Sequence, residues 1–169
     1  MKRCTMHVVL AGVLAVSFGC GSEDDGVPMT GLLEAYEAEV GELTALAAAH
    51  DTAVSGAADL AAMQAQETAY GTDAGGHMEE IEHAVLEMAE CTHDGHGPEL
   101  GDVGTALADL DAELTAHATA MAAAADVAAA GAEEARHQSA IADIAAVFDD
   151  AHDALHDEAA DFMCHEHGE

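Results

Sequence analysis

The chain has 169 residues, enough for one domain with a hydrophobic core. Alanine occupies 41 positions, proline only 2, and aromatic residues make up 3% with no tryptophan, so the composition favours long helices over a β-sandwich. Lys and Arg total 3 against 34 Asp and Glu, which gives a formal net charge of −31. Such a surface repels nucleic-acid phosphates and anionic lipid head groups. Both are therefore excluded as electrostatic partners, and metal ions are favoured.

The first twenty residues have the pattern of an export signal. Lys2 and Arg3 precede an apolar stretch over residues 6–18, which is too short to span a bilayer. The Gly19-Cys20 pair that follows resembles the lipobox of bacterial lipoproteins, in which the cysteine is acylated and becomes the mature N-terminus. The resemblance implies a signal peptide over 1–19 and a lipid on Cys20.

An acidic, Gly-containing segment over 20–29 then predicts a tether to the membrane. We therefore expect an exported bacterial protein, held by its lipid in the periplasm or at the cell surface. The alternative is an ordinary secreted protein that is cleaved near Gly19.

Four segments carry apolar residues at spacings of three and four, which predicts four amphipathic helices. The expected helices cover 30–54, 59–91, 100–121 and 127–162. Asp59 is the expected N-cap of the second helix, which Gly75-Gly76 is expected to kink. Short connections between the helices predict an all-α, up-down-up-down four-helix bundle over 30–164.

The second helical hairpin repeats the first at an offset of 67 residues. The repeat pairs His50 with His117, Glu67 with Glu134, and Tyr70 with His137, together with the acidic residues at the two interhelical turns. Because His and Glu match at the same offset, we expect two similar αα-hairpins related by a pseudo-twofold axis.

Polar residues occupy positions of the apolar seam that should face the core. His50 and Glu67 each lie about 13 Å from the first turn along their helices, and the repeat places His117 and Glu134 at the same height. These four residues are expected to form one layer, with Tyr70 and His137 in the adjacent layer. Buried carboxylates need compensation, since an unpaired one costs several kcal/mol, on the order of the stability of a small domain.

A divalent metal ion supplies this compensation, because two carboxylates neutralise its charge and imidazoles complete a ligand set suited to zinc, iron or manganese. The predicted ligands are His50, Glu67, His117, Glu134 and His137, with Tyr70 as a ligand or a neighbour of the ligands. Glu134 and His137 form a Glu-x-x-His pair that resembles those of the ferritin-like di-iron bundles. That resemblance implies metal ligands on facing helices, here with His50 and His117 in place of two glutamates.

Two other interpretations of the layer remain open. In the first, Glu67 and Glu134 hydrogen-bond to the histidines without a metal, and the protein is a non-catalytic structural or interaction lipoprotein. In the second, His50 and His117 hold a b-type haem between diagonal helices. With a metal, the role could be storage, delivery, sensing or redox chemistry, and the sequence leaves open whether the protein is an enzyme.

Cys91 and Cys164 fall at the ends of the second and fourth predicted helices, at the same end of the bundle. In an oxidising compartment we expect a disulfide between them. Alternatively the cysteines act as thiolate metal ligands beside nearby histidines. A further alternative is a solvated His-rich loop and a His-rich tail over 165–169, both of which bind metal only weakly. The histidines concerned are His93, His96, His165 and His167. His77, also on the seam, is expected to lie in the core or in a second site.

Overall fold

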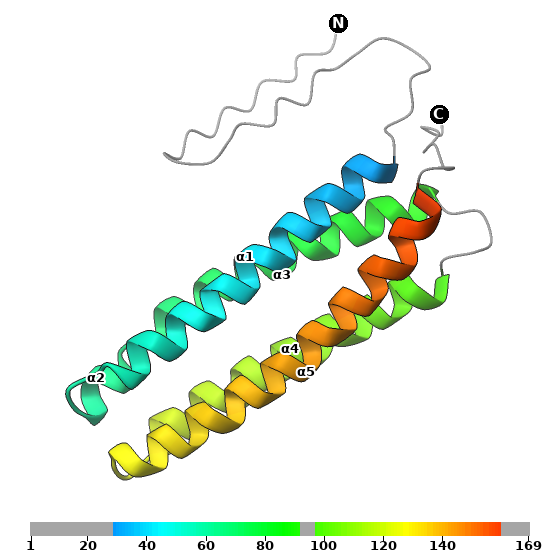
Figure 1. Cartoon of the computed structure of the whole chain (residues 1–169). Coiled ribbons are helices and arrows are strands. Elements are labelled where there is room, and N and C mark those ends of the chain that lie inside the picture. Colours follow the sequence, from blue (N-terminus) through cyan, green and yellow to red (C-terminus); the bar gives the residue numbers. More distant parts are fainter. Residues whose placement is uncertain (1–28, 92–96, 160–169) are drawn as a thin grey trace, which may run out of the picture.

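The structure is a computed structural model and describes residues 29–91 and 97–159. These residues form four long helices and one short helix, and this part of the chain contains no strand (Figure 1). The helices are α1 (Met29–Ser55), α2 (Leu60–Gln64), α3 (Glu67–Cys91), α4 (Gly97–Ala123) and α5 (Val127–Ala159).

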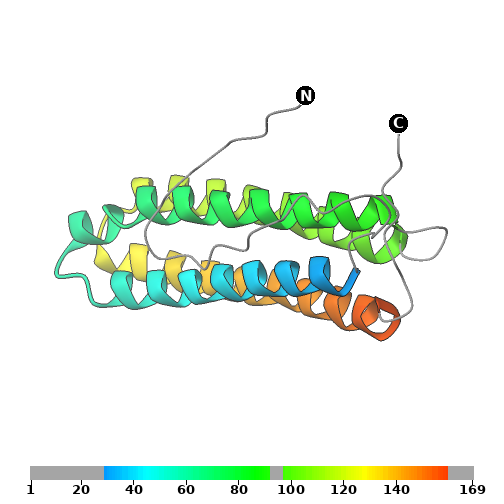
Figure 2. The same cartoon turned by 90° about the horizontal axis from the view of Figure 1, so that it is seen from above.

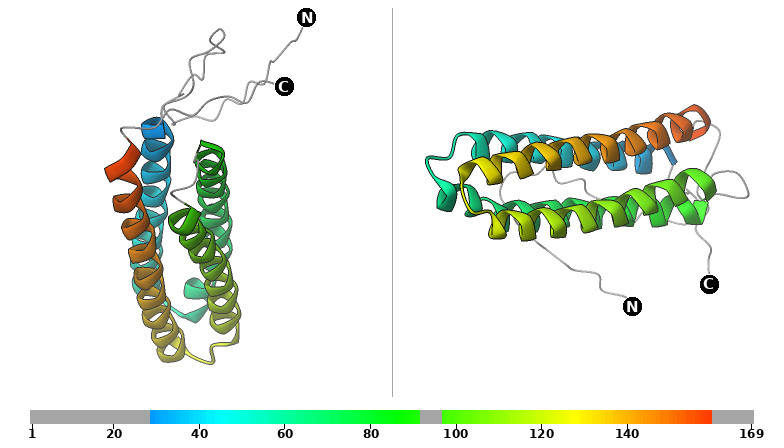
Figure 3. Two further views of the ribbon diagram at one scale, coloured as in Figure 1. Left: turned by 90° about the vertical axis from the view of Figure 1, so that its right-hand side faces the viewer. Right: turned by 90° about the horizontal axis from the view of Figure 1, so that it is seen from below.

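The four long helices form an up-down-up-down bundle, which confirms the predicted all-α fold. Helix α1 packs on α3 and α5, and α4 packs on α3 and α5, so that α1 lies diagonally from α4 and α3 from α5. The turn within each hairpin lies at the same end of the bundle, as views from several sides show (Figures 2 and 3). None of the described helices is both long enough and apolar enough to cross a membrane.

Equivalent aspartates start the second helix of each hairpin. The backbone N–H of Ala62 donates to Asp59 Oδ1 at 2.9 Å, and that of Ala129 donates to Asp126 Oδ1 at 2.8 Å. Each carboxylate satisfies an N–H group that the first turn of a helix leaves free. The predicted N-cap at Asp59 is therefore confirmed, and its equivalent in the repeat has the same role.

The second predicted helix is interrupted, but not where the sequence suggested. Gly75 and Gly76 lie inside the continuous helix α3, whereas the chain leaves the helix at Ala65 and Gln66. There the Gln66 N–H bonds the carbonyl of Met63, three residues back, at 3.1 Å, which tightens the chain into a turn. The glycines therefore do not break the helix, and the interruption lies about ten residues before them.

Two apolar clusters fill the bundle. The larger runs from the middle of the helices to the end far from the hairpin turns, and includes Tyr36, Ile81 and Phe148. The smaller lies at the turn end and consists of Val54, Met63, Met121 and Ala130. The polar layer predicted from the sequence lies between the two clusters.

Candidate metal centre

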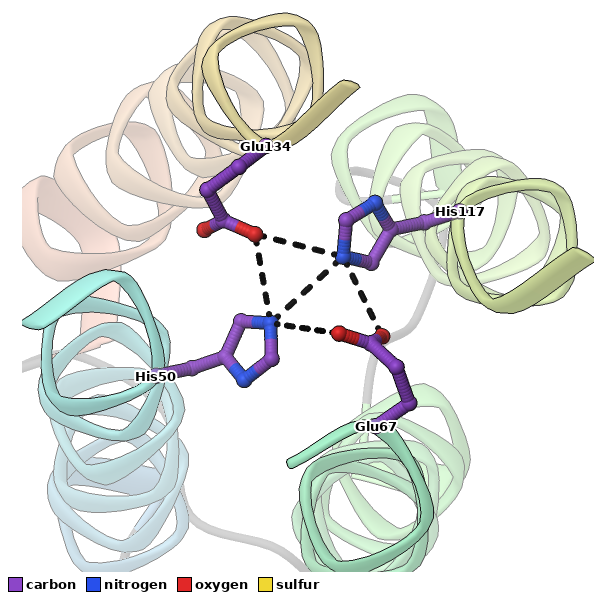
Figure 4. Close-up of side chains that lie close together, drawn as sticks. All are labelled: His50, Glu67, His117 and Glu134. Atoms are coloured by element: carbon purple, nitrogen blue, oxygen red, sulfur yellow. Dashed lines mark hydrogen bonds and ion pairs between the residues drawn. The ribbon is translucent and has the colours of Figure 1, made fainter. Parts of the chain in front are cut away.

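Each of the four long helices contributes one polar side chain to a single buried layer. His50 comes from α1, Glu67 from α3, His117 from α4 and Glu134 from α5, and all four point to the bundle axis (Figure 4). The histidines face each other from one pair of diagonal helices and the glutamates from the other pair. His50, His117 and Glu134 are buried, and Glu67 is nearly so. The structure thus brings together the four residues expected in one layer.

The polar atoms of this layer converge on one point. The Nε2 atoms of His50 and His117 are 3.4 Å apart, and Glu134 Oε2 lies 3.4 Å from both. Glu67 spans the two rings, with Oε1 at 3.3 Å from His50 Nε2 and Oε2 at 3.2 Å from His117 Nε2. Ligand atoms of all four residues lie within 4.8 Å of one another, so the group could hold a metal ion.

These separations match the edges of a coordination tetrahedron. In a regular tetrahedron the edge is about 1.63 times the distance from centre to corner, so a metal with bonds of about 2.0–2.1 Å requires edges of roughly 3.3–3.4 Å. The nitrogen–nitrogen and nitrogen–oxygen separations in the layer run from 3.2 to 3.4 Å, with a different oxygen of Glu67 facing each histidine. His50 Nε2, His117 Nε2 and Glu134 Oε2 therefore form one face of such a tetrahedron, and the Glu67 carboxylate, in reach of both nitrogens, is the candidate for the fourth corner.

Two buried oxygens of the layer lack a well-aligned hydrogen-bond donor. Glu67 Oε1 and Glu134 Oε2 are buried, and no donor in the described chain has good hydrogen-bond geometry toward them; their polar neighbours are the histidine Nε2 atoms at 3.3–3.4 Å. The other oxygen of Glu134 accepts a hydrogen bond from Gln138 Nε2 at 2.8 Å, which fixes the carboxylate in the layer. Unsatisfied buried carboxylate oxygens are costly in free energy, and a cation between them removes the cost.

The charges of the layer act on its titration. Burial lowers the pKa of His50, but the neighbouring carboxylates of Glu134 and Glu67 outweigh burial and raise this pKa to about 9. The same balance raises the pKa of His117 to about 10. Burial raises the pKa of both glutamates, yet the facing histidines lower that of Glu67 to about 2 and bring that of Glu134 well below its usual value. The layer therefore attracts positive charge to its centre, either as protons or as a metal ion.

Apolar residues isolate the layer on the turn side. Each of the four polar residues has an apolar neighbour four residues away in the chain, nearer to the end of the bundle where the hairpin turns lie; three of these neighbours share the helix of the polar residue, and the neighbour of Glu67 lies on the short helix α2. These neighbours are Val54, Met63, Met121 and Ala130. Exclusion of water strengthens electrostatic attraction between the layer and an ion.

Tyr70 and His137 lie in the adjacent layer, as expected, and are bonded to each other. The Tyr70 hydroxyl donates to His137 Nε2 at 3.1 Å, and His137 Nδ1–H donates to Glu113 Oε1 at 2.8 Å. Burial raises the pKa of Tyr70 and lowers that of His137, so both stay neutral. Both ring nitrogens of His137 are hydrogen-bonded, and neither His137 nor Tyr70 belongs to the group of four that could hold an ion, so the two residues lie beside that group.

The sequence did not predict three residues that support the buried histidines, namely Glu113, Glu133 and Arg136. His117 Nδ1–H donates to Glu133 Oε1 at 3.2 Å, so a carboxylate holds the ring from the side opposite the centre. Glu113 does the same for His137, and Arg136 binds both glutamates. The available signal was Arg136, the only Lys or Arg after Arg3. Hydrogen bonding to Arg136 lowers the pKa of Glu133 and, against the effect of burial, that of Glu113.

His77 lies at the surface of the bundle rather than in its core. Its Nδ1 is 2.8 Å from Glu39 Oε2 and 3.9 Å from Glu42 Oε2, and all three side chains are partly exposed. Ligand atoms of these three residues lie within 4.8 Å of one another. Unlike the core layer, this group is in contact with solvent, where exposed acidic side chains need no ion.

Several predicted sites fall outside the described residues. They are the signal peptide and Cys20, the cysteine side chains of the predicted disulfide, and the histidines of the loop and tail; by number these are Cys91, Cys164, His93, His96, His165 and His167. A search with the chain against models of protein families, curated proteins and solved structures found no match. Functional inference therefore rests on the geometry of the core layer.

Proposed function

We propose that the protein binds one divalent transition-metal ion in its core through His50, Glu67, His117 and Glu134. The observation that carries this proposal is the convergence of two imidazole nitrogens and two carboxylates at separations of 3.2–3.4 Å. Two carboxylates and two neutral imidazoles around a divalent ion make a neutral unit, which suits a buried position.

Zinc fits this site best among zinc, iron and manganese. Zinc is most often four-coordinate and tetrahedral, with nitrogen and oxygen ligands at about 2.0–2.2 Å. Iron and manganese commonly take more ligands, which here would have to be water, although apolar residues close the layer on its turn side. A site with all four corners supplied by the protein holds an ion without a free position for substrate. We therefore favour storage or delivery of zinc over catalysis.

The N-terminal sequence supports a location for this activity. With the signal peptide removed and a lipid on Cys20, the bundle would be tethered outside the cytoplasm of a bacterium. The loss of Lys2 and Arg3 would lower the formal charge from −31 to −33. A negative charge of this size would concentrate cations near the protein. An exported zinc-binding lipoprotein is the function that these features support.

A metal-free Glu-His network is the second candidate. The raised pKa values of His50 and His117 favour it, because two imidazolium groups would also neutralise the two carboxylates. Two protonated Nε2 atoms, however, would face each other at 3.4 Å, whereas a single ion accepts both lone pairs. The haem interpretation is disfavoured, since carboxylates lie 3.2–3.4 Å from the same nitrogens, where the porphyrin would have to lie.

Zinc titration of the chelator-stripped full chain tests the proposal. The Glu134→Gln variant removes one ligand charge, and Glu39→Gln is the matched control because it removes the carboxylate that faces His77 at the surface. We expect one tightly bound zinc per chain in the wild type and in Glu39→Gln, with a rise in melting temperature of roughly 10 °C at zinc about 100-fold above Kd.

Glu134→Gln should lose both the tightly bound zinc ion and the rise in melting temperature that zinc causes. Weak uptake by the His-rich segments should persist in all three proteins. A wild type whose melting temperature and tight zinc content match those of Glu134→Gln would contradict the proposal and favour the metal-free network.

A further inference from the structure

Arg136 is the only Lys or Arg downstream of Arg3, and both edges of its guanidinium group are occupied by carboxylates. Nη1 and Nη2 donate to Glu113 Oε2 and Oε1, each at 2.8 Å. Nε donates to Glu133 Oε2 at 3.0 Å, and Nη2 donates to Glu133 Oε1 at 2.6 Å. Two-point pairing of this kind fixes the geometry of a carboxylate as well as attracting its charge.

The oxygens that meet at Nη2 also bind the two buried histidines. Glu133 Oε1 accepts the Nδ1 proton of His117 at 3.2 Å, and Glu113 Oε1 accepts that of His137 at 2.8 Å. A continuous chain of hydrogen bonds therefore runs from His117 through Glu133, Arg136 and Glu113 to His137. The stacked rings of the two histidines, with centroids 3.9 Å apart, close this chain inside the core.

We propose that Arg136 is a positioning residue of the metal site, an inference that rests on the proposed function. Arg136 acts on the ion through Glu133 and His117. Glu133 can only accept a hydrogen bond from Nδ1, so the proton is kept on that atom and Nε2 presents its lone pair to the centre. Glu113 and Glu133 share the same sign and both approach Nη2, so without Arg136 they would repel each other. Glu133, which lies at the edge of the core, would then turn to solvent and release the ring.

This arrangement belongs to the second hairpin alone. At an offset of 67 residues, Glu133 corresponds to Gln66 and Arg136 to Ala69. Gln66 lies in the turn that interrupts the first hairpin, and its side chain donates to the carbonyl of Ala62. The hairpin of α4 and α5 therefore carries the half of the site in which hydrogen bonds fix the orientation of the histidine, and both of its helices are continuous. A site with one preset histidine needs less reordering to bind an ion.

Zinc affinity and the Nδ1 proton of His117 together test this role in the full chain. Competition with a chromophoric chelator should show that Arg136→Gln and Glu133→Gln weaken zinc binding by roughly 10–100-fold. Arg136→Lys, which keeps the charge without the two paired edges, should recover part of the loss. Glu39→Gln should bind zinc as the wild type does. NMR should detect a slowly exchanging His117 Nδ1 proton in the wild type, with or without zinc, but not in Arg136→Gln.

A role limited to fastening α4 to α5 predicts a different pattern, in which Arg136→Gln lowers the melting temperature but leaves zinc affinity and the Nδ1 proton unchanged. That pattern would overturn the inference. If the wild type binds no zinc, the proposed function fails by itself. The Nδ1 proton then decides whether Arg136 positions the His117 ring, because persistence of this proton in Arg136→Gln overturns that role and its loss supports it.

Discussion

His50 and His117 lie 67 residues apart in the chain and hold their Nε2 atoms 3.4 Å apart in the core. Each ring is stacked on an aromatic partner: His50 on Tyr70, with centroids 4.0 Å apart, and His117 on His137, with centroids 3.9 Å apart. Tyr70 and His137 are also separated by 67 residues in the chain. The two hairpins therefore deliver equivalent stacked pairs to one point. A pseudo-twofold axis between the two nitrogens would pass through the position proposed for the ion.

Removal of one ligand should cost more stability than removal of all four. His117→Leu leaves Glu67 and Glu134 facing His50 alone, and we expect the free energy of unfolding to fall by about 3–5 kcal/mol. Replacement of all four residues of the layer by Leu removes every buried charge and should leave stability unchanged or raise it by about 1–4 kcal/mol. Urea unfolding of the metal-free proteins measures both. A fourfold variant less stable than the single one would contradict the account of the layer.

The metal-free protein should lose stability as pH rises above neutrality. The pKa of His50 is raised from 6.5 to about 9 and that of His117 to about 10, so their stabilising contribution is complete below pH 6.5 and is lost through pH 9 to 10. The pKa of Glu67 is lowered from 4.5 to about 2, so its contribution is present above pH 4.5 and is lost as pH falls to 2.

Zinc should reverse the alkaline part of this profile, since binding displaces protons from the histidines. We expect the difference in melting temperature between the zinc-loaded and the chelated protein to widen from pH 6.5 to pH 9. Thermal unfolding at several pH values, in buffers that do not bind zinc, checks this. A difference that narrows over that range would contradict the proposed exchange of protons for metal.

Tyr70→Phe should destabilise the fold without affecting zinc binding. The variant removes the hydroxyl that donates to His137 Nε2 and leaves this nitrogen buried without a partner, at a cost of about 1–3 kcal/mol. Tyr70 is not in the group that converges on the centre, so zinc stoichiometry should stay the same. Denaturant unfolding combined with zinc titration tests both statements. Loss of the tightly bound zinc ion in Tyr70→Phe would show that Tyr70 is itself a ligand.

Cys20 should carry a lipid in the expressed protein. A labelled fatty acid should enter the wild type through this residue and be lost in Cys20→Ala, because the Gly19-Cys20 pair would then lack the atom that is acylated. Cys91→Ala is the matched control and should label as the wild type does. Equal labelling of wild type and Cys20→Ala would refute lipidation at this position.

Cys91 and Cys164 should form a disulfide when the protein is exported to an oxidising compartment. Peptide mapping without reduction should find one cross-linked peptide that contains both residues. The bond would join α3 to the C-terminal segment of the chain. Two free thiols in protein recovered from that compartment would rule the disulfide out.

The sequence determined the helices, the repeat and the layer. Alanine-rich segments with apolar residues every three or four positions can bury one face only as helices, and short turns place them side by side. His50, Glu67, His117 and Glu134 interrupt that face at equal distances from their turns, so distance along the helices was sufficient to place them together. The N-cap at Asp59 followed from local hydrogen bonding, which depends on neighbouring residues alone.

Only the tertiary structure decided which residues hydrogen-bond to the outer nitrogens of His117 and His137. Glu113 and Glu133 lie beside the apolar seam, and Arg136 is about half exposed, so nothing in the periodicity distinguishes them from other surface positions. Their contacts depend on how far each helix is rotated about its axis and on which rotamers the long side chains adopt between α4 and α5. The interruption of the helix at Ala65 and Gln66 likewise lacks a local signal. Such features arise from packing between helices, which a one-dimensional pattern does not encode.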